Sequence, residues 1–144
     1  MTQRPIRALI ARQKILAVAR ETTVLEAARL MKKMKVGAAM VVAKDKLIGI
    51  FTERDALFRV LAEGRDPAST QLAEVMTAKP QTVTADRPFG YALHLMLEGG
   101  FRHVPVVEDG RPVGMVSARD ALGPELQQFA DELERKTQIG EILG

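Results

Sequence analysis

The sequence predicts an α+β fold in which two β-α-β-β-α repeats pack face to face with pseudo-two-fold symmetry. Three observations lead to this prediction: an internal repeat, short apolar runs that alternate with helical periodicity, and an aliphatic composition. Shifting the 144-residue chain by 65 positions aligns residues 18–55 with residues 83–120 without a gap. One repeat of roughly 60 residues would leave an apolar sheet face exposed, so the pair is the expected folding unit.

The identical residues of the two copies fall on apolar stripes and at a strand-to-helix junction. They are Val18/Val83, Ala27/Ala92, Leu30/Leu95, Met31/Met96, Val41/Val106, Val42/Val107, Gly49/Gly114, Arg54/Arg119 and Asp55/Asp120. Because the matches concentrate where a fold and a site need them, they indicate a structural duplication.

The first copy begins with a short apolar segment at residues 15–18 and continues into a helix. Thr22 or Thr23 is the expected N-cap, and Thr23 with Glu26 has capping-box spacing. Gly37 is expected to break this helix. The residues at helical spacing that predict its buried face are Val24, Ala27, Ala28, Met31 and Met34.

A hairpin and a second helix follow in the first copy. Apolar strands are expected at residues 38–42 and 47–51, joined by a short charged turn. Thr52 should start a helix that runs to about Glu63, with Gly64 as its end.

The second copy repeats this order. A first strand is expected at residues 82–84, and Pro88 suits the first helical position. Gly99-Gly100 should end the helix. The expected hairpin has strands at residues 103–107 and 112–116 around an Asp109-Gly110 turn, after which Ser117 starts the final helix.

Three units follow from this reading of the chain. Residues 8–66 form the first copy, residues 71–130 the second, and residues 131–144 a C-terminal helical tail. A helical pattern near the start of the tail supports it, in Leu126, Phe129, Ala130 and Leu133.

The pattern Gly-x-x-[Ser/Thr]-x-x-Asp marks the junction of both copies, at residues 49–55 and 114–120. The hydroxyl group of Thr52 or Ser117 is placed to cap the following helix. Unpaired backbone N–H groups of the first turn, together with the helix dipole, are expected to form an anion site there.

Charged residues at the junctions extend this interpretation. The carboxylates of Asp55 and Asp120 could accept hydrogen bonds from a ribose diol. Arg54 and Arg119 add positive charge beside the anion site. Ordinary helix capping is the better explanation of a single junction taken alone, but the repetition of the junction at a fixed offset favours a pair of ligand-binding sites.

Composition narrows the classes of function. The chain has no Cys, an aromatic share of 4%, a formal charge of +3 and a sequence pI of about 9.4. Disulfides and thiol catalysis are excluded, and stacking platforms for single-stranded nucleic acid are not expected. The slightly basic surface suits either an anionic partner or plain solvation, and nucleic-acid binding is not expected.

The same features argue against a membrane protein and an enzyme. No apolar run approaches the roughly 20 residues of a membrane span, and the N-terminus lacks a secretory signal, so a cytoplasmic protein is expected. The two histidines and scattered carboxylates show no metal-ligand spacing and no partners for a nucleophilic Ser117. We therefore expect no catalysis, no metal and no required cofactor.

The whole pattern resembles a tandem pair of cystathionine-β-synthase (CBS) domains, often called a Bateman module. Four segments carry the resemblance: residues 49–55, residues 114–120, Phe101 to Gly114, and Val75-Met76-Thr77 with Pro80. It implies a regulatory module that binds an adenosine-containing ligand such as AMP, ADP, ATP, S-adenosylmethionine or NAD. It also implies a disk-like homodimer and a regulated protein that the sequence does not identify.

The resemblance assigns roles to individual residues. Thr52, Asp55, Ser117 and Asp120 would contact phosphate and ribose. Arg102 and His103 would contact phosphate, and adenine would lie against Thr82, Val83 and Pro105. An alternative is a scaffold or oligomerisation protein whose clefts bind nothing.

The two copies differ before their hairpins. The second copy has Arg102 and His103 where the first has Gly37 and Ala38. The clefts should therefore be unequal, and the cleft that uses Arg102 and His103 should bind a phosphorylated ligand more tightly.

Overall fold

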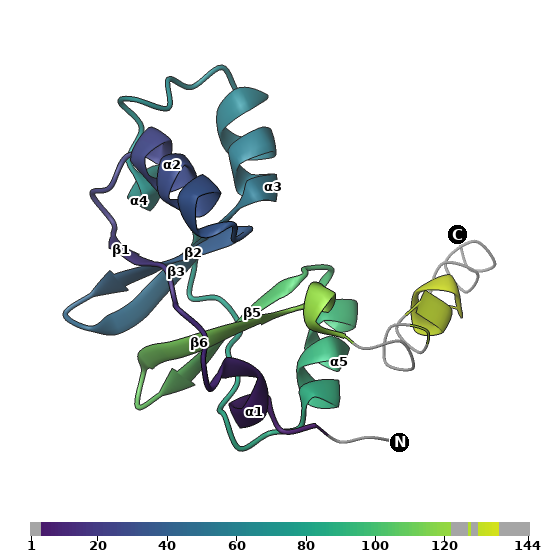
Figure 1. The fold of residues 1–144 in the computed structure, drawn as a ribbon. Coiled ribbons are helices and arrows are strands. Elements are labelled where there is room, and N and C mark those ends of the chain that lie inside the picture. Colours follow the sequence, from purple (N-terminus) through teal and green to yellow (C-terminus); the bar gives the residue numbers. More distant parts are fainter. Residues whose placement is uncertain (1–3, 122–126, 128–129, 136–144) are drawn as a thin grey trace.

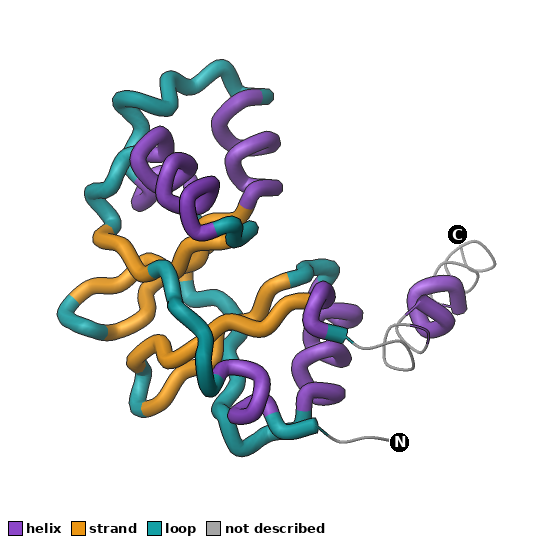
Figure 2. The backbone as a smooth tube through the Cα atoms, viewed as in Figure 1, coloured by secondary structure: helices purple, strands orange, loops and turns teal. Residues whose placement is uncertain are grey.

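Two small sheets face each other between two groups of helices in the computed structural model, which describes residues 4–121, 127 and 130–135 (Figure 1). The first sheet has the strand order β1-β2-β3-β4, and the second pairs β5 with β6. Figure 2 shows the strands meeting in the middle, with helices on the outer sides. The predicted α+β architecture of two packed repeats is confirmed.

The first copy contains β1 (Ala17–Ala19), α2 (Val24–Met34), β2 (Ala38–Ala43), β3 (Lys46–Thr52), α3 (Glu53–Asp55) and the π-helical segment η1 (Ala56–Leu61). The second contains α5 (Phe89–Gly99), β5 (His103–Glu108), β6 (Arg111–Ser117) and the 3₁₀ turn η2 (Ala118–Asp120). Three further elements lead into the copies: α1 (Ile6–Ile10), α4 (Leu72–Val75) and β4 (Thr77–Ala78).

Helix α2 follows the capping prediction but differs at two positions. The Thr23 side chain accepts a hydrogen bond from the Glu26 N–H at 3.2 Å. Ala28 is exposed rather than buried. The other apolar positions form a stripe along one side of the helix, and Ala28 lies beyond the edge of that stripe. The helix ends at Lys35, which adopts the left-handed conformation (φ 57°), and so stops before Gly37.

Both hairpins have the same design. The turn residues Lys44 and Asp45 have φ of 51° and 65°, and Asp109 and Gly110 have φ of 52° and 80°. Positive φ at both central residues gives a turn whose twist matches that of the strands. The tips touch each other, since the Leu47 N–H donates to the Gly110 carbonyl at 2.9 Å.

The first segment of each copy pairs in parallel with the copy's own hairpin. Strand β1 pairs with β2 through Val18 and Val41, and Val83 forms the equivalent parallel bridge with Val106. The strand predicted at residues 82–84 is thus a single bridge. Pro88 occupies the N-cap of α5, one residue earlier than predicted, because its extended conformation (φ −73°, ψ 152°) is that of an N-cap.

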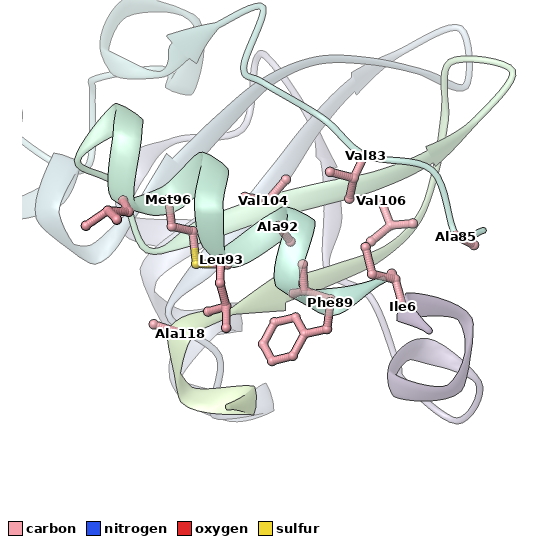
Figure 3. Packing of buried hydrophobic residues seen from close by; sticks show 12 residues of the cluster. Ile6, Val83, Ala85, Phe89, Ala92, Leu93, Met96, Val104, Val106 and Ala118 are labelled. Carbon is pink, nitrogen blue, oxygen red and sulfur yellow. The ribbon is translucent and has the colours of Figure 1, made fainter. Parts of the chain in front are cut away.

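The two copies exchange their leading helices. Ile6 of α1 is fully buried in the core of the second copy, beside Phe89 (Figure 3). Leu72 and Val75 of α4 are buried in the core of the first copy. The hydrophobic cores therefore cross the predicted sequence bounds of 8–66 and 71–130.

The junction glycines make room for these exchanged segments. A Cβ atom on Gly114 would lie 2.5 Å from Ile10 Cγ2, and one on Gly49 would lie 2.4 Å from Met76 Sδ. Next to Gly49, β4 pairs with β3 at the register Gly49–Ala78. At the equivalent place, the Gln13 side chain bonds the Met115 N–H and carbonyl, each at 2.7 Å.

Alternate strand residues separate the two faces of each sheet. Ala39 and Val41 pack with the helices of the first copy, and Val104 and Val106 with those of the second. Met40 and Pro105 point the other way and are fully buried. The predicted face-to-face packing buries this second face.

The ends of the copies differ. The first continues from α3 into η1, and Gly64 has a left-handed φ of 68° near the expected stop. Directly after Ser117 the three residues of η2 form a 3₁₀ turn, and Ala121 is extended (ψ 134°), so the final helix does not start at Ser117 as predicted. In the tail, Ala130 to Arg135 are helical, while Leu126 and Phe129 lie outside the described residues.

Candidate functional site

The fold forms two clefts at equivalent positions of its pseudo-symmetry. Cleft 1, of about 760 Å³, is lined by Ile50, Thr52, Glu53, Arg54, Asp55, Leu57, Phe58, Thr77, Lys79, Pro80, Gln81, Gly100, Phe101, Arg102 and His103. Cleft 2, of about 270 Å³, is lined by Gln13, Lys14, Ile15, Leu16, Lys35, Val36, Gly37, Ala38, Met40, His103, Met115, Ser117, Arg119 and Asp120. Each cleft combines the junction of one copy with the hairpin entrance of the other.

In cleft 1 the junction comes from the first copy and the basic residues come from the second. Thr52, Arg54 and Asp55 line it together with Arg102 and His103. The Arg54 Nη1 also donates to the Gly100 carbonyl at 3.3 Å, directly across the copy boundary. A ligand in this cleft would contact both copies at once.

Hydrogen bonds hold the first junction rigidly. The Thr52 N–H donates to Asp55 Oδ2 at 2.9 Å, and the Asp55 N–H donates to Thr52 Oγ1 at 3.2 Å, which completes a capping box. Asp55 is buried, and its Oδ1 lies 3.5 Å from Arg59 Nε. The carboxylate is thereby fixed in position, and a carboxylate retains lone pairs for further donors.

The second junction repeats the bond between the cap N–H and the Asp carboxylate. The Ser117 N–H donates to Asp120 Oδ2 at 2.8 Å. The Ala118 N–H donates to the Arg102 carbonyl at 3.1 Å, as the Glu53 N–H donates to the Gly37 carbonyl at 3.0 Å.

The prediction of unpaired N–H groups therefore needs a correction. At Thr52, Glu53 and Asp55 the backbone N–H already has an acceptor within the chain. A helix terminus whose donors are satisfied attracts an anion less strongly. The side chains of the clefts must provide most of the attraction for a phosphate group.

His103 lies where the two clefts meet and lines both. Its Nε2 would be 3.2 Å from a Cβ atom on Gly37, so the absence of a side chain at Gly37 leaves room for the ring. Burial lowers the pKa of His103 most strongly. Arg119 and Arg102 lower this pKa further, whereas Glu53 and Asp120 oppose the shift.

A third cavity of about 490 Å³ lies between the clefts. Its walls include Arg102 and His103, which line cleft 1, and Ser117 and Arg119, which line cleft 2. The described tail residues Ala130 and Leu133 close it on one side. The basic residues of the two clefts thus lie on one connected surface.

Three predicted adenine contacts lie elsewhere. Val83 is 4% exposed within the core of the second copy, and Pro105 is fully buried between the sheets. Thr82 is exposed and lines neither cleft. The equivalent wall is made by residues 77–81 in cleft 1 and by residues 13–16 in cleft 2.

The sequence contains a signal that marks these two walls. The same shift of 65 positions pairs Lys14 with Lys79, and each lysine lines its cleft. The comparison of the copies starts at Val18, so this pair falls just outside the aligned region. Lys79 also has a positive φ of 49°, which the sequence did not predict.

Two further features of the described part of the chain bear on function. None of its helices has both the length and the apolar character to cross a membrane. Among the same residues, no group of three or more His, Asp or Glu side chains is placed to hold a metal ion.

Known proteins share both the sequence pattern and the fold. The sequence profile of the CBS domain matches residues 6–62 and 72–123. A mitochondrial CBS domain-containing protein of Arabidopsis thaliana, CBSX3, is 35% identical over 120 residues, which cover 80% of this chain and 58% of that protein. The chain spans between 19% and 58% of the first curated relatives it matches.

Solved structures agree. A putative signal-transduction protein with CBS domains from Burkholderia ambifaria superimposes with a TM-score of 0.75 at 30% identity, over 81% of this chain and 89% of that one. The CBS domain protein PAE2072 of Pyrobaculum aerophilum, solved with AMP, has a TM-score of 0.74 at 25% identity, over 86% and 97%. This chain belongs to the CBS domain family and carries two such domains in tandem.

Proposed function

We propose that this protein is a regulatory module that binds an adenosine-containing ligand, with AMP, ADP or ATP as the first candidates, in cleft 1. One observation carries the proposal: the cleft brings the fixed Thr52–Asp55 junction of one copy against Arg102 and His103 of the other. Its volume of about 760 Å³ falls in the range of roughly 300–1,000 Å³ typical of small-molecule sites.

The chemistry of the walls suits a nucleotide. Arg102, Arg54 and Lys79 offer cations for phosphate groups, and the Asp55 carboxylate offers an acceptor for ribose hydroxyls. Ile50 and Pro80 supply apolar surface for a base. The AMP bound to PAE2072 supports the same ligand class.

The proposed mechanism is a ligand-dependent change in how the two copies sit together. A nucleotide that contacts Thr52 and Arg102 ties one copy to the other, and so favours the arrangement in which both contacts form. A protein that binds one arrangement better would then respond to the nucleotide. We propose binding without turnover, which chromatography of AMP after incubation with the protein would check.

We also propose that the module is a homodimer. Leu57, Phe58 and Leu61 form an exposed apolar patch, called the helical patch here, with 49%, 57% and 71% of their surfaces exposed. Contiguous apolar surface of this kind marks an interaction site. A related CBS protein of bloom-forming cyanobacteria, CBS-CP12, was solved as a hexamer.

A thermal-shift screen with AMP, ADP, ATP, S-adenosylmethionine and NAD tests the ligand proposal. A ligand that binds only the folded state raises the unfolding temperature, and 100 times its dissociation constant adds about 2.7 kcal/mol. No shift with any of the five would overturn the proposal. The helical patch would then favour the second candidate, a scaffold that acts through oligomerisation alone.

A further inference from the structure

The two equivalent helices end in the same backbone conformation with different residues. Helix α5 ends at Gly100, with φ of 72°, and α2 ends at Lys35, with φ of 57°. Glycine adopts this left-handed conformation without steric cost, whereas a residue with a Cβ adopts it at a cost. Lys44 and Lys79 share this conformation, so it is the position of Lys35 in the wall of a cleft that assigns its side chain a use.

Lys35 lines cleft 2 and joins two other cations there. The walls of this cleft carry Lys14, Lys35 and Arg119, and the one acidic residue among them is Asp120. The Asp120 carboxylate already accepts the Ser117 N–H at 2.8 Å. The Glu53 carboxylate lies beside the cleft as well, since its Oε1 would be 3.1 Å from a Cβ atom on Gly37. Three cations against these two carboxylates leave an excess of positive charge.

Cleft 1 places its charges differently. It contains Arg54, Lys79 and Arg102, with Glu53 and Asp55 as the acidic residues of its walls. In cleft 2 the position of Arg102 is taken by Gly37, and the cation stands two residues earlier, at Lys35.

The size of cleft 2 restricts what it can hold. Its volume of about 270 Å³ lies below the range of roughly 300–1,000 Å³ typical of sites for drug-sized molecules. Ile15 and Leu16 line this cleft where cleft 1 has Pro80 and Gln81. The His103 ring takes up space beside Gly37, and at Ser117 and Arg119 the cleft adjoins the third cavity.

We propose that cleft 2 is a site for a small oxyanion of phosphate size, held by Lys35 together with Lys14 and Arg119, and is not a second nucleotide site. The ligand is either free phosphate or the phosphate group of a small ester. Both present the same charged oxygens to the three cations. The proposal concerns the other cleft and stands whether or not cleft 1 binds a nucleotide.

The test is a titration of the full chain with inorganic phosphate at constant ionic strength, followed by amide NMR. We expect saturable shifts at Gly37 and Ser117, which line cleft 2. Lys35→Gly should weaken this binding by about tenfold, because one charged contact is lost. The variant keeps the helix end, since glycine is the residue at the equivalent position in α5.

A matched control separates charge from backbone effects. Lys44→Gly makes the same change at a residue with φ of 51°, in the exposed hairpin turn and outside both clefts. It should leave phosphate binding as in the wild type. Equal affinity for phosphate in the wild type and Lys35→Gly, or no saturable shift at Gly37 and Ser117, would overturn the proposal.

Parallel titrations identify the ligand and keep the two proposals distinct. Glycerol 3-phosphate binding more tightly than phosphate would assign a phosphate ester, and the reverse would assign the free ion; both support an oxyanion site. AMP saturating Gly37 and Ser117 as well as Thr52 would overturn it. Shifts with phosphate but none with AMP at Thr52 would leave this proposal standing and remove the nucleotide proposal.

Discussion

Clefts 1 and 2 share the same backbone hydrogen bonds at their junctions, but they differ in volume and in the side chains that line them. In both, the residue after the Thr or Ser cap donates its N–H to a carbonyl of the same copy, that of Gly37 or Arg102. In both, the Asp carboxylate accepts the N–H of the cap residue. The volumes nevertheless differ, about 760 Å³ against 270 Å³.

This difference shows which parts of a duplicated site can change. The capping bonds are needed for each strand-to-helix turn to form, so both copies retain them. The residues before each hairpin, 35–38 and 100–103, are not needed for the turn and have diverged. The specificity of each cleft therefore depends on the opposite copy, and the four predictions below test this asymmetry.

The largest effect is expected at the helical patch, which the described part of the second copy does not repeat. Leu61→Asp should convert the proposed dimer into monomers, because a buried leucine contributes about 1.5–3 kcal/mol and a two-fold interface contains it twice. Leu61 is 71% exposed and lines neither cleft, so ligand binding is not altered directly. Sedimentation equilibrium measures the change.

The control for this variant is Ala73→Asp, which adds the same charge at an exposed position of α4 outside the patch. It should remain dimeric. A Leu61→Asp protein that sediments like the wild type would rule out the helical patch as the interface.

The next effect concerns the cation present only in cleft 1. Arg102→Ala should weaken AMP and ATP binding by about ten- to a hundredfold, since loss of a charged hydrogen bond costs about 1.5–3 kcal/mol. Arg119→Ala, which removes a cation of cleft 2, should change AMP affinity little. Isothermal titration calorimetry of both variants tests this, and unchanged affinity in Arg102→Ala would contradict the assignment.

The equivalent junction glycines should differ in their tolerance of a methyl group. Gly114→Ala should lower the free energy of unfolding by about 1–3 kcal/mol, because the new Cβ meets the branched side chain of Ile10 at 2.5 Å. Gly49→Ala should cost less, because it first meets the flexible end of Met76. Urea unfolding ranks the two, and an equal or reversed order would show that the packing of α1 and β4 does not differ as described.

The smallest effect is the pH dependence due to His103. Burial and nearby arginines lower its pKa in the folded state. The unfolded chain, with a histidine pKa near 6.5, therefore takes up a proton at higher pH than the folded one. Stability from the neutral ring is complete above about pH 6.5 and declines as the pH falls toward the lowered folded-state pKa.

His103→Gln should thus flatten the loss of stability below about pH 6.5, measured by urea unfolding at a series of pH values. His94→Gln is the control, because His94 lies on the exposed side of α5, with its Nε2 3.9 Å from Glu98 Oε1. Identical slopes for the wild type and His103→Gln would show that this ring does not contribute.

Local interactions explain which predictions were confirmed. The Thr23 cap, the Thr52–Asp55 capping box and the Asp109-Gly110 turn each depend on residues within four positions of one another. Such interactions leave a direct trace in the sequence. The repeat then extended them to the equivalent places of the second copy.

The missed features depend on residues far apart in the sequence. Val83 and Pro105 matched the expected pattern of a ligand wall, yet the packing of the second copy buries them. Ser117 has a capping sequence like that of Thr52, but its helix stops at Asp120. No local rule distinguishes these cases, because the competing contacts come from other elements.

The amino-acid sequence alone reveals the duplication, the two junctions with their caps, and the unequal residues before the hairpins. Three features emerge only in the folded chain: α1 and α4 each pack in the core of the other copy, residues 77–81 and 13–16 form cleft walls, and Arg102 and Thr52 line the same cleft. Hydrogen-bonded turns form between near neighbours in the sequence, whereas each cleft is lined by segments far apart in the sequence that only tertiary packing brings together.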